Sequence, residues 1–460
     1  MMRLLRIPGG GEEFKMTRMS TRALSATTRL AVVLVGVWVA WSYAVAPPAV
    51  QAQGGTTAFT GARIFDGTGR PAIEQGTLVI SNGRVQQVGP QASVKVPDGA
   101  TRVDASGKTI VPGLINSHGH VAAVKDSPLP LREQLLAQLR MYANYGVTNV
   151  VSLGDDGVET VKLRDEQSQG GIRRARIFPA GVNVVAKTAE QARKDVDKLV
   201  DMKVSIIKTR VDGPDNSPTR MPPSVYGAII DEAHKKGMRI AAHMFYLKDA
   251  HGLVDAGVDV LAHSVRDQDV DQTLIANMKK RNVGYIPTLT RDLSVYVYES
   301  TPAFFKDPFF LRGKSLYGPQ MAQLSEPAMQ EKTRQSEEAR TIKVAMVQAQ
   351  KNLKRLSDAG IRIAMGTDTG ANLMGRWQGY FEHTELELMV KSGLTPMQAL
   401  VAATSGAAKA MNLQQLGTLE SGNWADLVVL GANPLTDIRN TQKIESVWIA
   451  GQRLAPTSSN

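Results

Sequence analysis

Two histidines one residue apart, His118 and His120, end a short apolar run that begins at Val111. In a β-strand, residues i and i+2 point to the same face, so these two imidazoles should project side by side from the end of one strand. Neutral imidazole is a common ligand of transition metals. A lone His-x-His pair is a weak signal, so its meaning depends on what the rest of the chain brings to the same place.

Four further residues with metal-binding or acid–base side chains stand at or near the ends of predicted strands, namely Lys208, His243, His263 and Asp368. The chain has 7 histidines, and four of the seven fall at such strand ends, which packing alone explains poorly. Cysteine is absent, so there is no disulfide framework or thiolate site. Any transition metal must therefore be held by His, carboxylate or modified Lys side chains.

Alternating apolar strands and amphipathic helices predict the scaffold that positions these residues. With the strand that bears His118, the pattern gives eight βα units in residues 113–412, which indicates a parallel (β/α)8 TIM barrel in an α/β protein. Active sites of such barrels lie at the carboxyl ends of the strands, where all six residues stand. The other predicted strands are 147–153, 177–182, 204–211, 239–243, 258–263, 283–289 and 362–368, and the clearest helices are 131–145, 189–202 and 224–236.

Short strands also precede and follow the barrel region, in residues 53–112 and 413–460. Asn82 and Gly83 form a hairpin-turn signal between two strands of the first region. Neither region could make a stable sheet alone, so we expect both to pair in one small β-domain beside the barrel. The predicted strands of the two regions are 57–60, 76–80, 84–88, 425–430 and 446–451.

One long segment, residues 291–335, interrupts the seventh βα unit. It carries 7 of the 20 Phe and Tyr residues of the chain in about a tenth of its length, and this aromatic enrichment argues against disorder. Two interpretations stay open. The aromatic side chains pack against the barrel flank or a subunit interface, or the segment is a lid over the substrate.

The ordered set of motifs resembles the amidohydrolase superfamily, and its later motifs resemble the branch that contains imidazolonepropionase and prolidase. The resemblance covers nearly all of residues 56–452, and it is specific as a set although no single motif is. The matching segments are 112–120, 206–208, 241–243, 261–263, 366–368, 383–386, 393–396 and 425–430.

The resemblance implies a barrel with a composite β-sandwich and a site for two divalent metal ions, with zinc as the expected metal. Matched position by position, His118, His120 and Asp368 would bind one ion, and His243 and His263 the other. Lys208 matches a lysine that captures CO2 and bridges the two ions as an anionic carbamate. The alternative is a mononuclear site with a structural Lys208, as in relatives that deaminate bases.

The same resemblance implies a role for Asp368 as ligand and proton acceptor, which passes the proton of water to the leaving nitrogen. Two metal ions close together acidify a water molecule and polarise a carbonyl. His383, just after the eighth-strand loop, is expected to support the site or to contact substrate.

Arg210 follows Lys208 by two residues, on the same strand face and nearer the barrel mouth. A guanidinium there suits a substrate carboxylate, and the alternative is an ion pair with Asp212. Tyr226 and Tyr246 are weaker candidates for the pocket rim.

The first 52 residues predict a secretory signal: a basic region up to Arg29, the 17-residue apolar run 30–46, and a small-x-small cleavage pattern at 50–52. The mature protein would then begin at Gln53 and be periplasmic or extracellular, without a stable membrane anchor. The alternative is an uncleaved anchor, although the run is short for a spanning helix. This region accounts for +4 of the net charge of +11, and elsewhere basic and acidic residues alternate, so no nucleic-acid-binding stripe is expected.

Taken together, these features predict an exported, metal-dependent amidohydrolase that acts on a small molecule. The expected substrate is a carboxylate-bearing dipeptide, an N-acyl amino acid or an ochratoxin-like aromatic amide. The alternatives are a cyclic-amide hydrolase or deaminase of the same superfamily, and a catalytically silent binding protein of the same fold. Assembly into a homo-oligomer also stays open.

Overall fold

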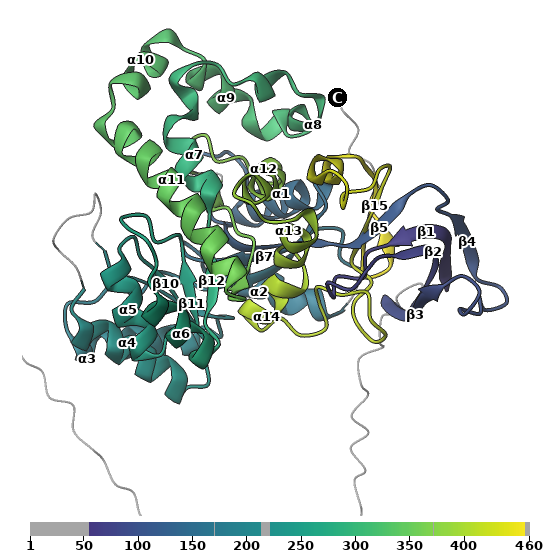
Figure 1. Ribbon diagram of the computed structural model, residues 1–460, viewed down its shortest axis with the longest axis horizontal. Coiled ribbons are helices and arrows are strands. Elements are labelled where there is room, and N and C mark those ends of the chain that lie inside the picture. The colour runs from purple at the N-terminus through teal and green to yellow at the C-terminus, as the bar shows by residue number, and fades with distance from the viewer. Residues whose placement is uncertain (1–54, 170, 213–220, 371, 456–460) are drawn as a thin grey trace, which may run out of the picture. The chain divides into compact units, whose positions relative to one another are not determined.

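The computed structural model describes residues 55–169, 171–212, 221–370 and 372–455 (Figure 1). The expected signal segment, 1–52, lies outside the described residues. Within the described residues, no helix is both long and apolar enough to cross a membrane.

Strands from both ends of the chain form one eight-stranded sheet in the order β17-β16-β15-β5-β1-β2-β3, with β4 paired to β1. The link between the two ends is the antiparallel pair β15 and β5, in which Val428 lies opposite Val111. The pairing of N-terminal and C-terminal strands is thus as expected. The strands are β1 (Thr57–Ile64), β2 (Ile73–Ser81), β3 (Arg84–Pro90), β4 (Thr101–Asp104), β5 (Thr109–Pro112), β15 (Leu427–Leu430), β16 (Ile444–Ile449) and β17 (Gln452–Arg453).

Nine further strands form two parallel sheets, in the orders β14-β6-β7-β8 and β13-β12-β11-β10-β9. Backbone hydrogen bonds connect the two sheets at both edges: the amide of Ser205 donates to Pro179 at 2.7 Å, and that of Ser117 donates to Met365 at 2.8 Å. The strands are β6 (Leu114–His120), β7 (Val147–Ser152), β8 (Arg176–Pro179), β9 (Ile207–Arg210), β10 (Ile240–His243), β11 (Val260–Ala262), β12 (Gly284–Ile286), β13 (Arg362–Ile363) and β14 (Thr369–Gly370).

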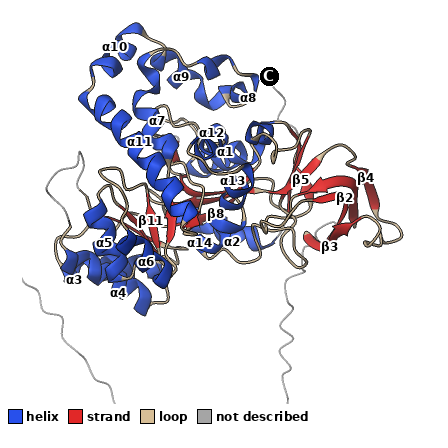
Figure 2. Cartoon of the chain, viewed as in Figure 1, coloured by secondary structure: helices blue, strands red, loops and turns tan. Residues whose placement is uncertain are grey.

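Helices alternate with these strands and pack around them (Figure 2). Local signals define their ends: the side chains of Thr188 and Asp271 cap two helix N-termini, and Gly257 ends another helix in the left-handed conformation. The helices are α1 (Leu131–Asn144), α2 (Val158–Glu166), α3 (Ala189–Asp201), α4 (Pro223–Lys235), α5 (Leu247–Ala256), α6 (Gln272–Arg281), α12 (Tyr380–Lys391), α13 (Pro396–Ala402) and α14 (Ser405–Met411), with the 3-10 turns η1 (Gln167–Gln169) and η5 (Ile438–Gln442).

The aromatic insertion folds as a series of helices that pack by their own side chains. Phe310 is fully buried and packs edge-to-face with the buried ring of Trp377, at 5.3 Å between ring centroids. The Tyr145 hydroxyl donates to the backbone oxygen of Phe310 at 2.7 Å. Of the two interpretations, the structure therefore supports the first, in which the aromatic side chains of this segment are used in packing. Its elements are α7 (Leu289–Tyr296), η3 (Val297–Glu299), η4 (Ala303–Lys306), α8 (Pro308–Leu311), α9 (Lys314–Leu324) and α10 (Pro327–Gln335). The long helix α11 (Glu337–Asp358) follows the insertion.

Candidate metal centre

The carboxyl-terminal parts of four parallel strands, with the segment between β13 and β14, bring together the residues that the sequence singled out. Strand β6 ends with His118 and His120, β9 contains Lys208, and β10 ends at His243. His263 follows β11 directly, and Asp368 directly precedes β14. Because the parallel strands run in register, their carboxyl ends meet at one edge and these side chains converge there.

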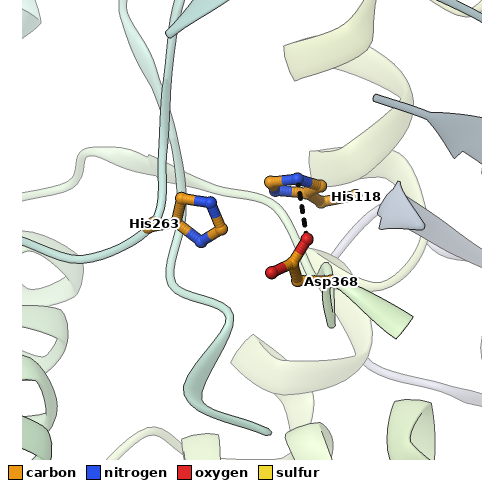
Figure 3. A group of neighbouring side chains, drawn as sticks. All are labelled: His118, His263 and Asp368. Atoms are coloured by element: carbon orange, nitrogen blue, oxygen red, sulfur yellow. Dashed lines mark ion pairs between the residues drawn. The ribbon is translucent and has the colours of Figure 1, made fainter. Parts of the chain in front are cut away.

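His118, His263 and Asp368 form the centre of this group (Figure 3). Each offers one ligand atom, and these atoms all lie within 4.8 Å of one another. Nε2 of His118 lies 3.3 Å from Oδ1 of Asp368. Two imidazoles and a carboxylate at this spacing match the donor set that zinc and similar ions prefer.

The other three predicted ligands surround this centre. Nε2 of His120 lies 2.7 Å from Oδ1 of Asp368. Nζ of Lys208 lies 3.4 Å from Nε2 of His118, and the His243 ring centroid lies 4.3 Å from that of His263. All six side chains are therefore within reach of one small volume.

Burial keeps these groups in the protonation states that bind cations. It holds the pKa of His118 and of His263 well below the usual value, and lowers that of His243 to about 4, so their imidazoles are neutral near pH 7. Nδ1 of His118 is buried without a hydrogen-bond partner in the described part of the chain. Burial also lowers the pKa of Lys208 to about 8, which increases the fraction of neutral amine that can react with CO2. The donor set thus fits a metal site with a carboxylated lysine.

Arg376 is a functional residue that sequence reasoning missed. Its Nη1 lies 2.5 Å from Oδ2 of Asp368, and both side chains are largely buried. Burial alone would raise the pKa of Asp368, but the charges of Arg376 and His118 and the hydrogen bond from His120 together outweigh it, and the pKa is well below its usual range. Asp368 is therefore an anion whose second oxygen is held in place. Arg376 lies eight residues after Asp368 in an irregular loop, so no periodicity could link them.

The centre lies in a cavity of about 240 Å³, whose described lining adds the cations Arg210, Arg291 and Arg376 to the six predicted residues. A second cavity of about 550 Å³ adjoins it, and Arg210, His243 and Arg291 line both. A substrate larger than the group that meets the metal site could extend into this outer space. Arg291 is paired with Asp292 at 2.9 Å and was also missed by the sequence reading.

Arg210 lies at the cavity boundary, as its strand position predicted, and it also makes the ion pair that stood as the alternative. Its Nε lies 3.1 Å from Oδ1 of the buried Asp212. Nε2 of His243 lies 3.1 Å from Oδ2 of the same carboxylate. Burial raises the pKa of Asp212, but the hydrogen bond from His243 and the charge of Arg210 bring it below the usual value. Asp212 thus contacts both His243, a predicted metal ligand, and Arg210, a predicted substrate contact.

Three residues around the centre adopt the left-handed backbone region, with φ of 81° at His263, 48° at Thr288 and 57° at Asp368. Residues other than glycine rarely adopt such backbone angles, and for β-branched Thr288 the conformation is a clear outlier. Nδ1 of His263 lies 2.7 Å from Oγ1 of Thr288. Such local strain is concentrated at functional sites, where surrounding contacts maintain it.

The described lining of the two cavities does not include Tyr226, Tyr246 or His383. His383 is buried on α12, where Nδ1 lies 2.9 Å from Oγ1 of Thr441 and Nε2 lies 2.8 Å from the backbone oxygen of Tyr145. Both ring nitrogens are thus used in packing α12, which corrects the expectation that His383 contacts substrate or supports the site.

The two tyrosines also differ from expectation. Tyr226 lies on α4 and is buried with its hydroxyl against the backbone of α5 at Gly252, because the helix turns it outward from the strands. Tyr246 caps α5, and its ring centroid lies 4.8 Å from that of Phe245, which itself lines the outer cavity.

The family model described as the Amidohydrolase family matches residues 109–454. An imidazolonepropionase from Deinococcus deserti is 36% identical over 105 residues, 22% of this chain and 26% of the relative. Ochratoxinase from Aspergillus niger is 25% identical over 295 residues, 61% of this chain and 52% of the relative. This chain thus matches only about a quarter to a half of the length of these curated relatives.

Solved structures match over more of their length. A protein from Bifidobacterium longum assigned as a prolidase has 27% identity and a TM-score of 0.72, covering 87% of this chain and 94% of that one. The ochratoxinase structure has 20% identity and a TM-score of 0.68 over 88% of this chain and 97% of that one, a likeness of fold alone.

Proposed function

Because this chain belongs to the amidohydrolase family, as a hydrolase that acts on carbon–nitrogen bonds, we propose that it is a metal-dependent enzyme that hydrolyses an amide bond in a small, carboxylate-bearing substrate. The observation that carries the proposal is the convergence of His118, Lys208, His263 and Asp368, with their buried neighbours, at one edge of the parallel strands. All six expected ligand positions carry metal-binding side chains, which counts against a catalytically silent protein.

The proposed site holds two divalent ions, with zinc as the expected metal. His118, His120 and Asp368 would bind one ion, His243 and His263 the other, and Lys208 would bridge them as a carbamate formed with CO2. When bound, the two ions supply Lewis-acid chemistry that polarises an amide carbonyl and makes water more acidic.

The protein's own groups supply the proton transfer. Asp368 is anionic, and Arg376 holds its Oδ2 while Oδ1 faces His118 and His120. We propose that this carboxylate accepts the proton of the attacking water and delivers it to the leaving nitrogen, since amide hydrolysis requires a protonated amine to depart. Arg376 favours the carboxylate form, which suits an acceptor that must start deprotonated.

The proposed substrate is a dipeptide, an N-acyl amino acid or an ochratoxin-like aromatic amide. Relatives described as a prolidase and as ochratoxinase support this class. So does the chemistry of the cavity boundary, because Arg210 and Arg291 line both cavities and a guanidinium binds carboxylate through paired hydrogen bonds. The outer cavity of about 550 Å³ has room for an additional side chain or ring.

The second candidate is hydrolysis of a cyclic amide, or deamination, within the same superfamily. The match to imidazolonepropionase favours it, although that match spans 105 residues.

One screen separates these candidates. Purified protein loaded with zinc and bicarbonate is incubated with dipeptides, N-acyl amino acids, their amidated versions and cyclic amides, and amine or ammonia release is measured together with metal content. Amide cleavage of free-acid substrates supports the main proposal. Activity on cyclic amides alone favours the second candidate, and metal binding without any turnover favours a binding protein.

We propose that the two parallel sheets close into a (β/α)8 barrel, supported by the hydrogen bonds at both edges, and that the terminal sheet curves into a sandwich.

We also propose export to the periplasm or medium with a mature start near Gln53. N-terminal sequencing of protein from the producing cell that recovers the Arg29 region would contradict export with cleavage.

A further inference from the structure

Helix α12 carries two buried carboxylates, Glu382 and Glu385, that the proposed reaction does not use. Both are fully buried, and neither forms an ion pair within the described residues. Burying a carboxylate is costly unless hydrogen bonds compensate, so the position of these groups requires an explanation. Their side-chain partners lie on segments that bear a residue of the metal centre or directly follow Thr288, which contacts His263.

Glu385 holds the segment after β12. Its Oε1 accepts the backbone N–H of Leu289 at 2.8 Å, and its Oε2 accepts the backbone N–H and the hydroxyl of Thr290, both at 2.7 Å. The residue before Leu289 is Thr288, with its left-handed backbone and its hydroxyl 2.7 Å from Nδ1 of His263. Glu385 therefore fixes the two amides that follow the strained residue facing His263.

Glu382 holds the other half of the centre. Its Oε1 accepts hydrogen bonds from Nδ2 of Asn116 at 2.6 Å, from the Thr367 hydroxyl at 2.8 Å and from the Thr369 hydroxyl at 3.0 Å. Oδ1 of Asn116 in turn accepts the backbone N–H of His118 at 2.9 Å. The two threonines flank Asp368. One oxygen atom thus connects the strand of His118 to the loop of Asp368.

We propose that Glu385 and Glu382 are positioning residues, the first setting His263 for one metal ion and the second setting His118 and Asp368 for the other. Partners that orient the ligands of a metal commonly change its affinity by ten- to a hundredfold when they are removed. When Nδ1–H of His263 donates to Thr288, the lone pair on Nε2 is available to a cation. The proposal rests on the metal-dependent function above.

The sharpest test is Glu385→Gln. Glutamine keeps the size of the side chain but replaces one acceptor oxygen with an NH2 group, which would face a backbone N–H. We expect the variant to fold and to lose affinity for one of two ions by ten- to a hundredfold while the other stays bound. Glu382→Met removes the shared acceptor and should weaken the opposite ion. Glu387→Gln is the control on the same helix, because Glu387 is partly exposed and contacts Gln442.

The readouts are zinc content after graded exposure to a chelator, the visible spectrum of cobalt-substituted protein, and the melting temperature of the metal-free chain. A purely structural role predicts a lower melting temperature with both ions bound at wild-type affinity, and this result would overturn the proposal. If Glu385→Gln does not fold, Thr288→Val tests the same path, and unchanged affinity for both ions in that variant would equally overturn it. Wild-type protein that binds no metal would instead refute the proposed function.

Discussion

Nδ1 of His263 lies 2.7 Å from Oγ1 of Thr288, and both residues adopt the left-handed backbone region. Strained residues of this kind cost of order 1–3 kcal/mol each and persist only where their surroundings enforce them. The contact orients one imidazole of the centre before any ligand arrives, which is the arrangement expected of a preorganised site.

This relationship predicts that the hydroxyl of Thr288 matters for metal affinity. Thr288→Val keeps the branched shape but removes the hydroxyl, and we expect the weaker of two zinc ions to bind about ten- to a hundredfold less tightly. Thr288→Ser keeps the hydroxyl and should retain most of the affinity. Chelator-competition titrations measure both, and equal loss in the two variants would indicate a backbone effect instead.

Lys208→Ala should abolish hydrolysis and reduce the bound metal to fewer than two ions per chain. The side chain is buried 3.4 Å from His118, so its loss removes the group proposed to bridge the ions. A short-chain carboxylic acid should partly restore activity by occupying the vacated space. Lys194→Ala, at an exposed position on α3, is the matched control and should behave as wild type. Full metal content in Lys208→Ala would contradict the bridging role.

Arg210→Ala should mainly raise KM for free-acid substrates, because a contact with the carboxylate exists in both the ground state and the transition state. A charge-assisted contact contributes roughly 1.5–3 kcal/mol, so kcat/KM should fall about ten- to a hundredfold. Arg210→Lys should rescue only partly, since it keeps the charge without the planar fork.

Amidated substrates provide the control for Arg210. They should be poor substrates of the wild-type enzyme and should lose little more on mutation. Equal wild-type rates on free-acid and amidated forms would leave the ion pair with Asp212 as the role of Arg210.

The buried carboxyl of Glu385 predicts a pH-dependent stability difference. Burial raises the pKa of Glu385 to about 7, although the hydrogen bonds from Thr290 and Leu289 act to lower it. The folded state therefore binds this proton more tightly than the unfolded state, where the pKa is near 4.5. The stabilising contribution is complete below about pH 4.5 and is lost as the pH rises through about 7.

Relative to Glu385→Gln, metal-free wild-type protein should thus lose up to about 3 kcal/mol of stability across that window. Urea unfolding of both proteins between pH 4.5 and 8 gives the difference. A difference that does not change with pH would mean that Glu385 titrates as an ordinary carboxyl.

The aromatic insertion predicts a separation of stability from metal binding. Phe310 is fully buried among Phe305, Tyr317 and Trp377, so Phe310→Ala should lower the free energy of unfolding by about 3–5 kcal/mol. Zinc affinity should stay unchanged because these rings lie outside the lining described for the metal cavity. If Phe310→Ala instead raised KM without changing the free energy of unfolding, the result would favour the interpretation of this segment as a lid over the substrate.

Local sequence signals predicted much of this architecture. The helices expected at 131–145, 189–202 and 224–236 agree with α1, α3 and α4 to within a residue at each end, because amphipathic spacing acts locally. Thr188 also caps the N-terminus of α3. The parallel strands are shorter than predicted, since apolar residues continue past the hydrogen-bonded ladder. The last one, expected at 362–368, is bonded as β13 only at Arg362–Ile363.

Contacts made by irregular segments could not be predicted in this way. Arg376 reaches Asp368 from an irregular loop, so no strand or helix period links them. The ion pair of Asp212 with Arg210 stood as an alternative in the sequence, but the contact of Asp212 with His243 did not. His383 was misread because a histidine in a family-like motif suggested chemistry, whereas tertiary packing uses both of its nitrogens.

The pairing of β15 with β5 has a consequence for synthesis of the chain. Strand β5 leads through Gly113 directly into β6, which bears His118, and its partner lies more than 300 residues later. During translation, the edge of β5 that pairs with β15 stays without its partner strand until β15 has left the ribosome. Contacts of such long sequence separation fold slowly and leave an aggregation-prone edge exposed meanwhile. A chaperone or a pause in translation late in the message would thus act on the same strand pair that supports the first two histidines.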